Sequence, residues 1–180
     1  MNTHRQLSKI AAEWLLNQYY IDLVTWELKY VGGVYDVIGL SSNEKSKEKK
    51  VVAIEVKKTR SDLLQDLRKR KMLKYEKRAT HCYLAATAEA FRANKFSNRE
   101  ILADLKKKGL PQHWGVLLLP SQGNTKPRVL RGARKHKSVR ITTIRTLTRK
   151  IARSFMYRVM SPTSPMTEGQ YNVSDVGISC

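Results

Sequence analysis

The sequence predicts an α/β sandwich built on a mixed β-sheet. Residues 4–18 repeat apolar side chains with the 3.6-residue period of an amphipathic helix, and β-branched or aromatic runs follow at residues 21–30, 34–40, 51–56 and 82–86. A second helical segment separates the third run from the fourth. The resulting core order, αβββαβ, is neither a strict β-α-β alternation nor all-helical, so we expect helices packed against one mixed sheet.

The first two strands should form a hairpin, because Gly32-Gly33 separates the runs at 21–30 and 34–40. Residues 41–50 are charged and poor in apolar side chains, which is typical of a connector. The next run, residues 51–56, is almost continuously apolar. This pattern is typical of a strand that is covered on both faces.

The second half of the chain predicts further elements. A helix is expected over residues 61–75, and Ser97 with Glu100 has the capping-box spacing of a helix that ends at Lys107. Strands are expected at residues 114–119 and 128–130. The inward residues of the 61–75 helix are predicted to be Leu63, Leu64, Leu67 and Met72. A last amphipathic helix with a basic far side is marked by Ile141, Ile144, Leu147, Ile151, Phe155 and Val159.

The charge of the chain predicts its kind of partner. The 180 residues include 35 Lys and Arg against 15 Asp and Glu, which gives a formal net charge of +20. Such a positive field by itself favours a polyanion, either a nucleic acid or an acidic membrane surface. The apolar runs are too short to span a membrane, so no membrane partner is expected. The first residues lack the apolar run of a secretory signal, and two cysteines are too few for a disulfide framework, so we expect the cytosol.

The positive charge is unevenly placed along the chain. No acidic residue occurs between Asp104 and Glu168, although Lys and Arg recur throughout that interval. We therefore expect a core over residues 1–120, a basic extension over 121–160 packed on or beside it, and a flexible tail rich in Ser and Pro over 161–180. Charge alone is equally compatible with a solvated basic surface.

Three residues of the predicted strands can do chemistry together. Glu55 and Lys57 share one face of the central strand, and Asp36 lies in the middle of the preceding apolar run. Burying these charges is costly unless partners neutralise them. A divalent cation such as Mg²⁺ binds carboxylate oxygens, so Asp36 and Glu55 are candidate ligands, and Lys57 would stabilise charge on a phosphate. The alternatives are an exposed Glu55–Lys57 salt bridge and a turn-capping role for Asp36.

The other titratable residues give weaker signals. Asp62 and Asp66 fall in the first turns of a predicted helix, where acids interact favourably with the helix dipole, and Asp66 is expected to pair with Arg70. The four histidines are scattered without metal-ligand spacing, so zinc is not expected.

Asp36, followed on the next strand by Glu55-Val56-Lys57, resembles the D…(D/E)xK signature of the PD-(D/E)XK nuclease superfamily. The resemblance covers roughly residues 5–120 and looks like the MmcB-type DNA-repair nucleases and their phage relatives. It implies a restriction-endonuclease-like core that hydrolyses DNA with Mg²⁺ or Mn²⁺ in the cytosol of a bacterium or a phage-infected host. The further segments that carry it are Glu55 to Asp66, Lys69 to Met72 with Tyr75, Cys82 to Ala85, and Leu110-Pro111 with Trp114-Gly115.

The resemblance also implies roles for single residues. Asp36, Glu55 and the Val56 carbonyl would hold the metal, and Lys57 would be the catalytic lysine; Glu13 and Glu27 are the candidates for an additional acid. The segment from Lys71 to Tyr75 is similar to the Q-x-x-x-Y element of RecB-like exonucleases, with Lys71 in place of Gln. The residues expected to contact nucleic acid are Lys58, Lys69, Lys71, Tyr75, Arg134, Lys135 and Lys137.

The sequence thus predicts a divalent-metal-dependent deoxyribonuclease that acts in DNA repair, recombination or phage DNA processing. A non-catalytic nucleic-acid binder on the same fold is the main alternative, and a basic RNA-associated or ribosome-associated protein is a third interpretation that rests on charge. RNA therefore stays open as a partner. The sequence also leaves open whether cutting is endonucleolytic, which DNA structure is preferred, and whether the chain forms a homodimer.

Overall fold

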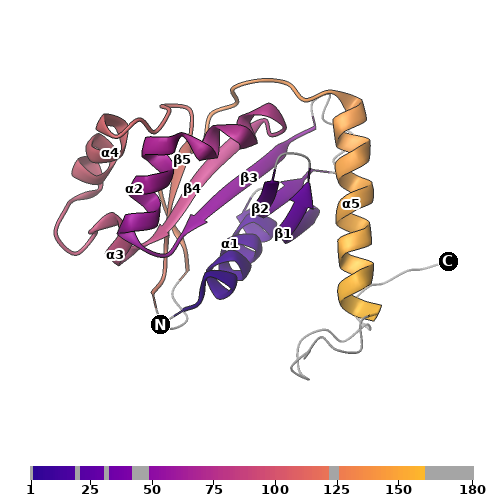
Figure 1. The fold of residues 1–180 in the computed structure, drawn as a ribbon, viewed down its shortest axis with the longest axis horizontal. Coiled ribbons are helices and arrows are strands. Elements are labelled where there is room, and N and C mark those ends of the chain that lie inside the picture. The colour runs from indigo at the N-terminus through magenta and orange to yellow at the C-terminus, as the bar shows by residue number, and fades with distance from the viewer. Residues whose placement is uncertain (1, 19–20, 31–32, 42–48, 122–125, 161–180) are drawn as a thin grey trace.

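The computed structural model describes residues 2–18, 21–30, 33–41, 49–121 and 126–160 (Figure 1). The described strands form one six-stranded sheet in the order β1-β2-β3-β4-β5-β6. The β3–β4 and β4–β5 pairs are parallel and the other three pairs are antiparallel, so the predicted α/β class and mixed sheet are confirmed. The strands are β1 (Leu23–Tyr30), β2 (Gly33–Leu40), β3 (Val51–Lys57), β4 (His81–Thr87), β5 (Gly115–Leu119) and β6 (Arg128–Arg131).

Helices cover both faces of the sheet (Figure 1). On one face α1 (His4–Gln18) packs its Leu7 and Leu15 into a cluster that includes Val52 and Ile54 of β3. We call this face the α1 side. The opposite face, the α2 side, carries the larger apolar cluster. The elements on that side are α2 (Arg60–Lys69), the 3₁₀-helix η1 (Lys71–Lys77), α3 (Ala88–Phe91) and α4 (Asn98–Lys107).

β3 is buried on both sides, as its apolar run predicts. All residues from Val51 to Val56 are buried. Val52, Ile54 and Val56 belong to the cluster on the α1 side, whereas Val51 and Ala53 belong to the cluster on the α2 side. Because side chains alternate along a strand, Glu55 and Lys57 lie on the α2 side together.

The helix predicted over residues 61–75 is wrong in its second half. α2 ends at Lys69, because Arg70 adopts the left-handed conformation with φ 48° and donates its N–H to the Asp66 and Leu67 carbonyls. The chain then continues as η1. A left-handed helix end usually carries Gly or Asn, so an arginine there gives no signal in the sequence. The capping box of α4 is confirmed, whereas the short helix α3 is not predicted.

The last helix, α5 (Ile141–Met160), stands beside β1 at the edge of the sheet (Figure 1). Leu147 and Ile151 are buried in the larger cluster, but Ile141 is 56% and Phe155 is 64% exposed. The predicted apolar face is therefore buried only near the middle of the helix. No described helix, α5 included, is long and apolar enough to cross a membrane. The predicted tail at 161–180, Gly32 and residues 42–48 of the connector lie outside the described residues.

Candidate active site

The strands β1 and β2 reverse the direction of their side chains at the facing residues Glu27 and Asp36. In β2, Ile38 packs on the α2 side and Val37 on the α1 side, yet Tyr35 packs on the α2 side again. Strict alternation would put Tyr35 on the same side as Val37. Opposite this point Glu27 has φ 53°, a conformation that residues other than glycine seldom adopt. Asp36 therefore lies at a local twist of the hairpin.

The twist directs the Asp36 carboxylate toward β3. The β2–β3 ladder stops one residue short of Asp36, and continuing its register would place Asp36 opposite Glu55. Beyond the ladder the Val56 N–H is donated to Asp36 Oδ2 at 2.8 Å. His4 Nε2 lies 3.7 Å from the same carboxylate oxygen and 3.2 Å from the Val56 carbonyl oxygen. The Asp36 carboxylate raises the pKa of His4 despite partial burial.

Glu55 holds a carboxylate inside the sandwich, where its residue is only 5% exposed. Its Oε1 lies 2.6 Å from Lys57 Nζ, but its Oε2 is buried without a hydrogen-bond partner among the described residues. The Tyr75 hydroxyl lies nearby and donates its proton to the Val34 carbonyl at 3.0 Å. Burial, followed by the charge of Asp36, raises the pKa of Glu55 to about 7 against the opposing effect of Lys57.

Lys57 is held between two carboxylates. Its Nζ lies 2.6 Å from Glu55 Oε1 and 2.5 Å from Asp66 Oδ2. Burial lowers the pKa of Lys57, but the Glu55 and Asp66 carboxylates outweigh burial and raise the pKa to about 12. The ammonium is therefore charged at neutral pH. The site thus brings together the three residues predicted from the sequence, Asp36 of β2 with Glu55 and Lys57 of β3. It adds one acid from α2, Asp66.

Two residues of this site are not predicted from the sequence, His4 and Asp66. The sequence predicts an Asp66–Arg70 pair, whereas the structure places the Asp66 carboxylate, in a residue that is 8% exposed, against Lys57. Asp66 shares the inward side of α2 with Leu63 and Leu67, and an acid on an apolar face was the available signal. His4 has no comparable signal, because it reaches Asp36 from a distant helix.

Asp36, Glu55 and Val56 offer oxygen atoms of the type that hard divalent cations bind. The unpartnered Glu55 Oε2, the Asp36 carboxylate and the Val56 carbonyl are oxygen donors of the kind that Mg²⁺ and Mn²⁺ prefer. A site with two carboxylates leaves the remaining coordination positions to water and to substrate phosphate. The described residues contain no group of three or more His, Cys, Asp and Glu side chains that could hold a metal by themselves.

The two candidates for an additional acid are therefore not gathered with Asp36 and Glu55. Glu13 is exposed on α1. Glu27 has its side chain 39% exposed and its Oε2 3.9 Å from Arg5 Nε. Glu27 contributes to the site through its left-handed backbone conformation, which lies opposite Asp36, and not through its carboxylate.

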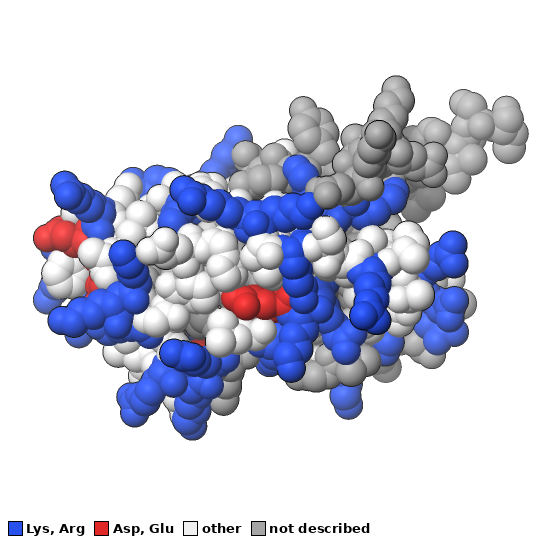
Figure 2. All heavy atoms as spheres, turned by 90° about the horizontal axis from the view of Figure 1, so that it is seen from above, with Lys and Arg blue, Asp and Glu red and all other residues white. Residues whose placement is uncertain are grey.

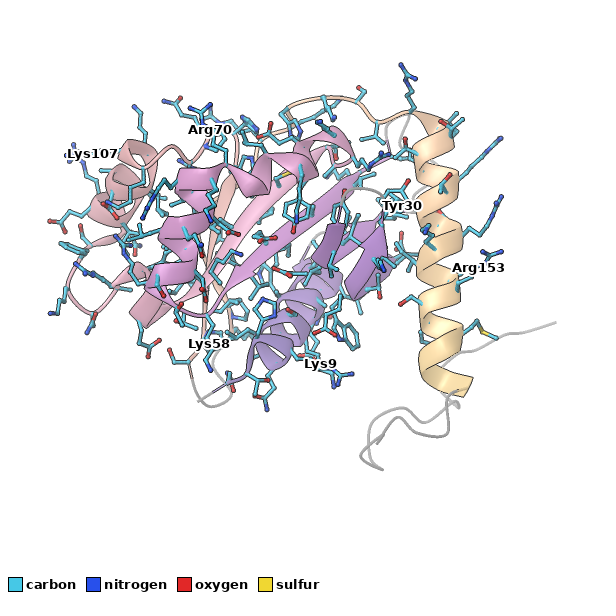
Figure 3. All side chains as sticks on the ribbon, in the orientation of Figure 1. Lys9, Tyr30, Lys58, Arg70, Lys107 and Arg153 are labelled. Carbon is cyan, nitrogen blue, oxygen red and sulfur yellow. The ribbon has the colours of Figure 1, made fainter. Side chains whose placement is uncertain are left out.

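The residues predicted to contact nucleic acid do not form a single surface. Lys58 precedes α2 and Lys69 ends it; Figure 3 shows Lys58 and Arg70, the residue after Lys69, at opposite ends of this helix. Tyr75 is only 2% exposed, and its hydroxyl donates a hydrogen bond to the Val34 carbonyl, so its side chain does not lie on the surface. The structure does not describe the side chain of Lys71.

The basic cluster of the extension is divided between two surface hollows. Arg134 lines one hollow together with Lys106 and Arg131. Lys137 lines the other. Lys135 lies between Arg134 and Lys137 in the sequence, and its side chain is exposed. Figure 2, which shows the molecule from above, has many Lys and Arg side chains around areas of uncharged residues, and acidic side chains in only a few places.

Comparison with known proteins identifies the fold but no family. No family model matches the chain, and no curated protein matches it. Among solved structures, a protein of unknown function from Silicibacter pomeroyi is similar with a TM-score of 0.65 and 20% identity over 96% of this chain and 99% of that one. The two proteins thus share their fold over nearly their full lengths. SfsA from Pyrococcus furiosus, solved in complex with Ca²⁺, gives a TM-score of 0.28 and 11% identity over 69% of this chain and 59% of that one, too low to carry an argument.

Proposed function

We propose that this protein is a divalent-metal-dependent nuclease that hydrolyses DNA phosphodiester bonds. The observation that carries the proposal is the buried Glu55 carboxylate, whose Oε2 has no hydrogen-bond partner among the described residues and whose neighbours are Asp36 and Lys57. Burying a carboxylate without full pairing lowers the stability of the folded chain, so stability does not explain why Glu55 is there. A strongly perturbed carboxylate with specific charged neighbours is a frequent property of catalytic sites.

Asp36, Glu55 and the Val56 carbonyl would hold the cation. A bound Mg²⁺ or Mn²⁺ supplies Lewis acidity toward a phosphoryl oxygen and lowers the pKa of water. The Val56 N–H and His4 fix the orientation of the Asp36 carboxylate. Lys57 stays protonated between its two carboxylates, so its role is to stabilise negative charge on the reacting phosphate and not to accept a proton.

The same residues support an assignment to the PD-(D/E)XK nuclease superfamily and to its restriction-endonuclease-like fold. The Asp36, Glu55 and Lys57 positions match the D…(D/E)xK signature, and the core order β1-β2-β3-α2-β4 behind α1 is compatible with a restriction-endonuclease-like sandwich. The formal net charge of +20 supports DNA as the substrate. A role in DNA repair, recombination or phage DNA processing belongs to the same proposal.

The test is a cleavage assay with single-stranded, duplex, flapped and four-way-junction DNA and with RNA, in Mg²⁺ or Mn²⁺ and in EDTA. We expect cutting of DNA only with the cation. Glu55→Gln and Lys57→Ala should each lower the rate by about a hundredfold or more, the size of effect seen when one transition-state donor is removed. The matched controls are Glu89→Gln and Lys95→Ala, which change the same charges at exposed positions and should cut like the parent.

Equal cutting by the parent, Glu55→Gln and Lys57→Ala would overturn the assignment of the site. No cutting of any substrate by a protein that still binds DNA would favour a non-catalytic nucleic-acid binder on the same fold. Circular dichroism of each variant separates loss of activity from loss of folding.

A further inference from the structure

A hollow of about 420 Å³ lies on the α2 side of the molecule, between the end of η1 and the segment that leads into α5. We call it the Lys137 hollow. Its size is in the range of small-ligand sites and exceeds what a single water molecule needs. The residues that line it are Lys77, Arg78, Lys137, Ser138, Val139, Arg140 and Thr143.

The lining of the Lys137 hollow is positively charged. Four of its seven residues are cations, two carry hydroxyl groups, and none is acidic. Burial lowers the pKa of Lys137 against the opposing effects of Cys82 and Glu76, and the charges of Arg78 and Lys77 contribute smaller effects in the same direction as burial. Cations gathered this closely repel one another, so a bound anion would relieve an electrostatic cost of the fold.

The backbone at the hollow adds to this positive charge. Arg140 immediately precedes α5, a helix of 20 residues with no acidic residue in its first turn, and the Arg140 carbonyl accepts the N–H groups of Thr143 and Ile144. The earlier N–H groups of a helix have no partner within it, and the N-terminal end carries partial positive charge. The hollow therefore combines side-chain cations with a positive helix end.

The hollow is separate from the candidate active site but lies on the same side of the sheet. Arg78 lies over the Tyr30 ring at 5.2 Å, Tyr30 neighbours Tyr35, and the Tyr35 and Tyr75 rings are 4.7 Å apart. Tyr75 in turn neighbours Glu55. A packed layer of three tyrosines thus separates the two places, and Figure 3 shows Tyr30 next to α5.

η1 carries a row of two exposed cations that leads to the Lys137 hollow. In a 3₁₀-helix residues three apart lie one above the other, so Lys74 and Lys77 share one exposed face. The row ends at the Lys137 hollow, to which Lys77 contributes. A polyanion that follows this row would pass from the region of Gly33, near which the Lys74 side chain lies, to the hollow.

We propose that the Lys137 hollow binds a backbone phosphate of DNA other than the phosphate that is cut. This inference rests on the proposed function for its substrate. The hollow has no aromatic lining residue on which a base could stack, so the contact holds the backbone and does not read sequence. It would fix the direction in which the strand crosses η1.

The test measures binding of a fluorescent 20-base-pair duplex in EDTA, where cutting is absent. Lys77→Gln combined with Lys137→Gln should weaken binding about tenfold, because a charge-assisted hydrogen bond of roughly 1.5 kcal/mol corresponds to that factor. The slope of log affinity against log salt should become shallower by about 0.9 for each phosphate that the variant no longer neutralises. Several duplex sequences should bind more weakly to the same degree.

The matched control is Lys95→Gln combined with Arg99→Gln, which removes the same net charge from exposed positions outside the hollow. It should bind DNA nearly like the parent. Arg140→Gln provides a second variant at an exposed lining residue, should the Lys77 and Lys137 pair fail to fold. Equal loss of affinity in the hollow variant and the control would overturn the proposal.

Two further measurements separate the possible results. The first is the affinity of the parent and of the hollow variant for pyrophosphate. If the hollow variant loses pyrophosphate binding but binds the duplex with the affinity of the parent, the hollow binds a free phosphate compound and the proposal is overturned. In the cleavage assay the hollow variant should raise KM and leave kcat unchanged, whereas Glu55→Gln should lower the rate of cutting by about a hundredfold or more and leave duplex binding in EDTA intact. Failure of the hollow is thus distinguishable from failure of the nuclease proposal.

Discussion

Glu55 carries a carboxyl group whose protonation is coupled to folding. Its pKa is about 7 in the folded chain, against an ordinary value of 4.5, chiefly because burial disfavours the charged form. A raised carboxyl pKa contributes stability that is fully present below pH 4.5 and is lost as the pH rises through about 7. The fold therefore tolerates this carboxylate at a cost that grows toward neutral pH.

The cost predicts the pH dependence of stability in EDTA. The free energy of unfolding of Glu55→Gln relative to the parent should rise by about 2 to 3 kcal/mol between pH 4.5 and pH 8, since one pKa unit corresponds to about 1.4 kcal/mol. Urea denaturation at several pH values measures it. The pH-dependent contributions of groups that both proteins share, such as His4 and His81, cancel in this difference. Parallel stability curves for the two proteins would show that Glu55 titrates normally.

The break between α2 and η1 is the element that positions Tyr75 beside Glu55. It depends on Arg70, which holds φ 48° at a position where glycine is favoured. Arg70→Gly should therefore raise the free energy of unfolding by up to about 1 kcal/mol, because the left-handed conformation costs other residues roughly 1–2 kcal/mol and the added flexibility of the unfolded chain offsets part of this.

Thermal unfolding of three variants isolates the backbone effect. Arg70→Ala removes the charge and keeps the Cβ, so it should not stabilise. Arg92→Gly tests the same reasoning at the left-handed end of α3, where φ is 58°. A destabilised Arg70→Gly beside an unaffected Arg70→Ala would mean that the conformation of Arg70 carries no strain.

The sequence predicts a helix or strand well where apolar side chains keep a regular spacing throughout the element. It predicts poorly where a single residue with an unusual backbone conformation breaks the element. The central strand is predicted because Val51 to Val56 are continuously apolar, and this placed Glu55 and Lys57 on one face correctly. The twist at Glu27 and the helix end at Arg70 are missed, since both are left-handed residues without glycine. His4 is missed because only tertiary packing brings it to Asp36, whereas Asp66 is missed although its place beside Leu63 and Leu67 on the inward side of α2 was a signal in the sequence.

At the scale of the whole molecule, the formal net charge of +20 sets self-repulsion against the packing of the two apolar clusters. The described residues form few ion pairs, so these pairs do not neutralise this field. The excess of positive charge therefore lowers the stability of the folded chain. Binding of a polyanion and screening by salt should both reduce that loss of stability.

This balance predicts that added NaCl stabilises the free protein. The Debye length falls from about 30 Å at 0.01 M salt to about 8 Å at 0.15 M, so repulsion between distant cations is largely screened over this range while packing is unaffected. The melting temperature should rise by roughly 2–4 °C for each kcal/mol of repulsion that is relieved. Lys95→Gln with Arg99→Gln, which lowers the net charge, should respond less. A melting temperature that falls with added NaCl would show that ion pairs such as Lys57–Asp66 and Arg60–Asp104, which salt weakens, outweigh the repulsion.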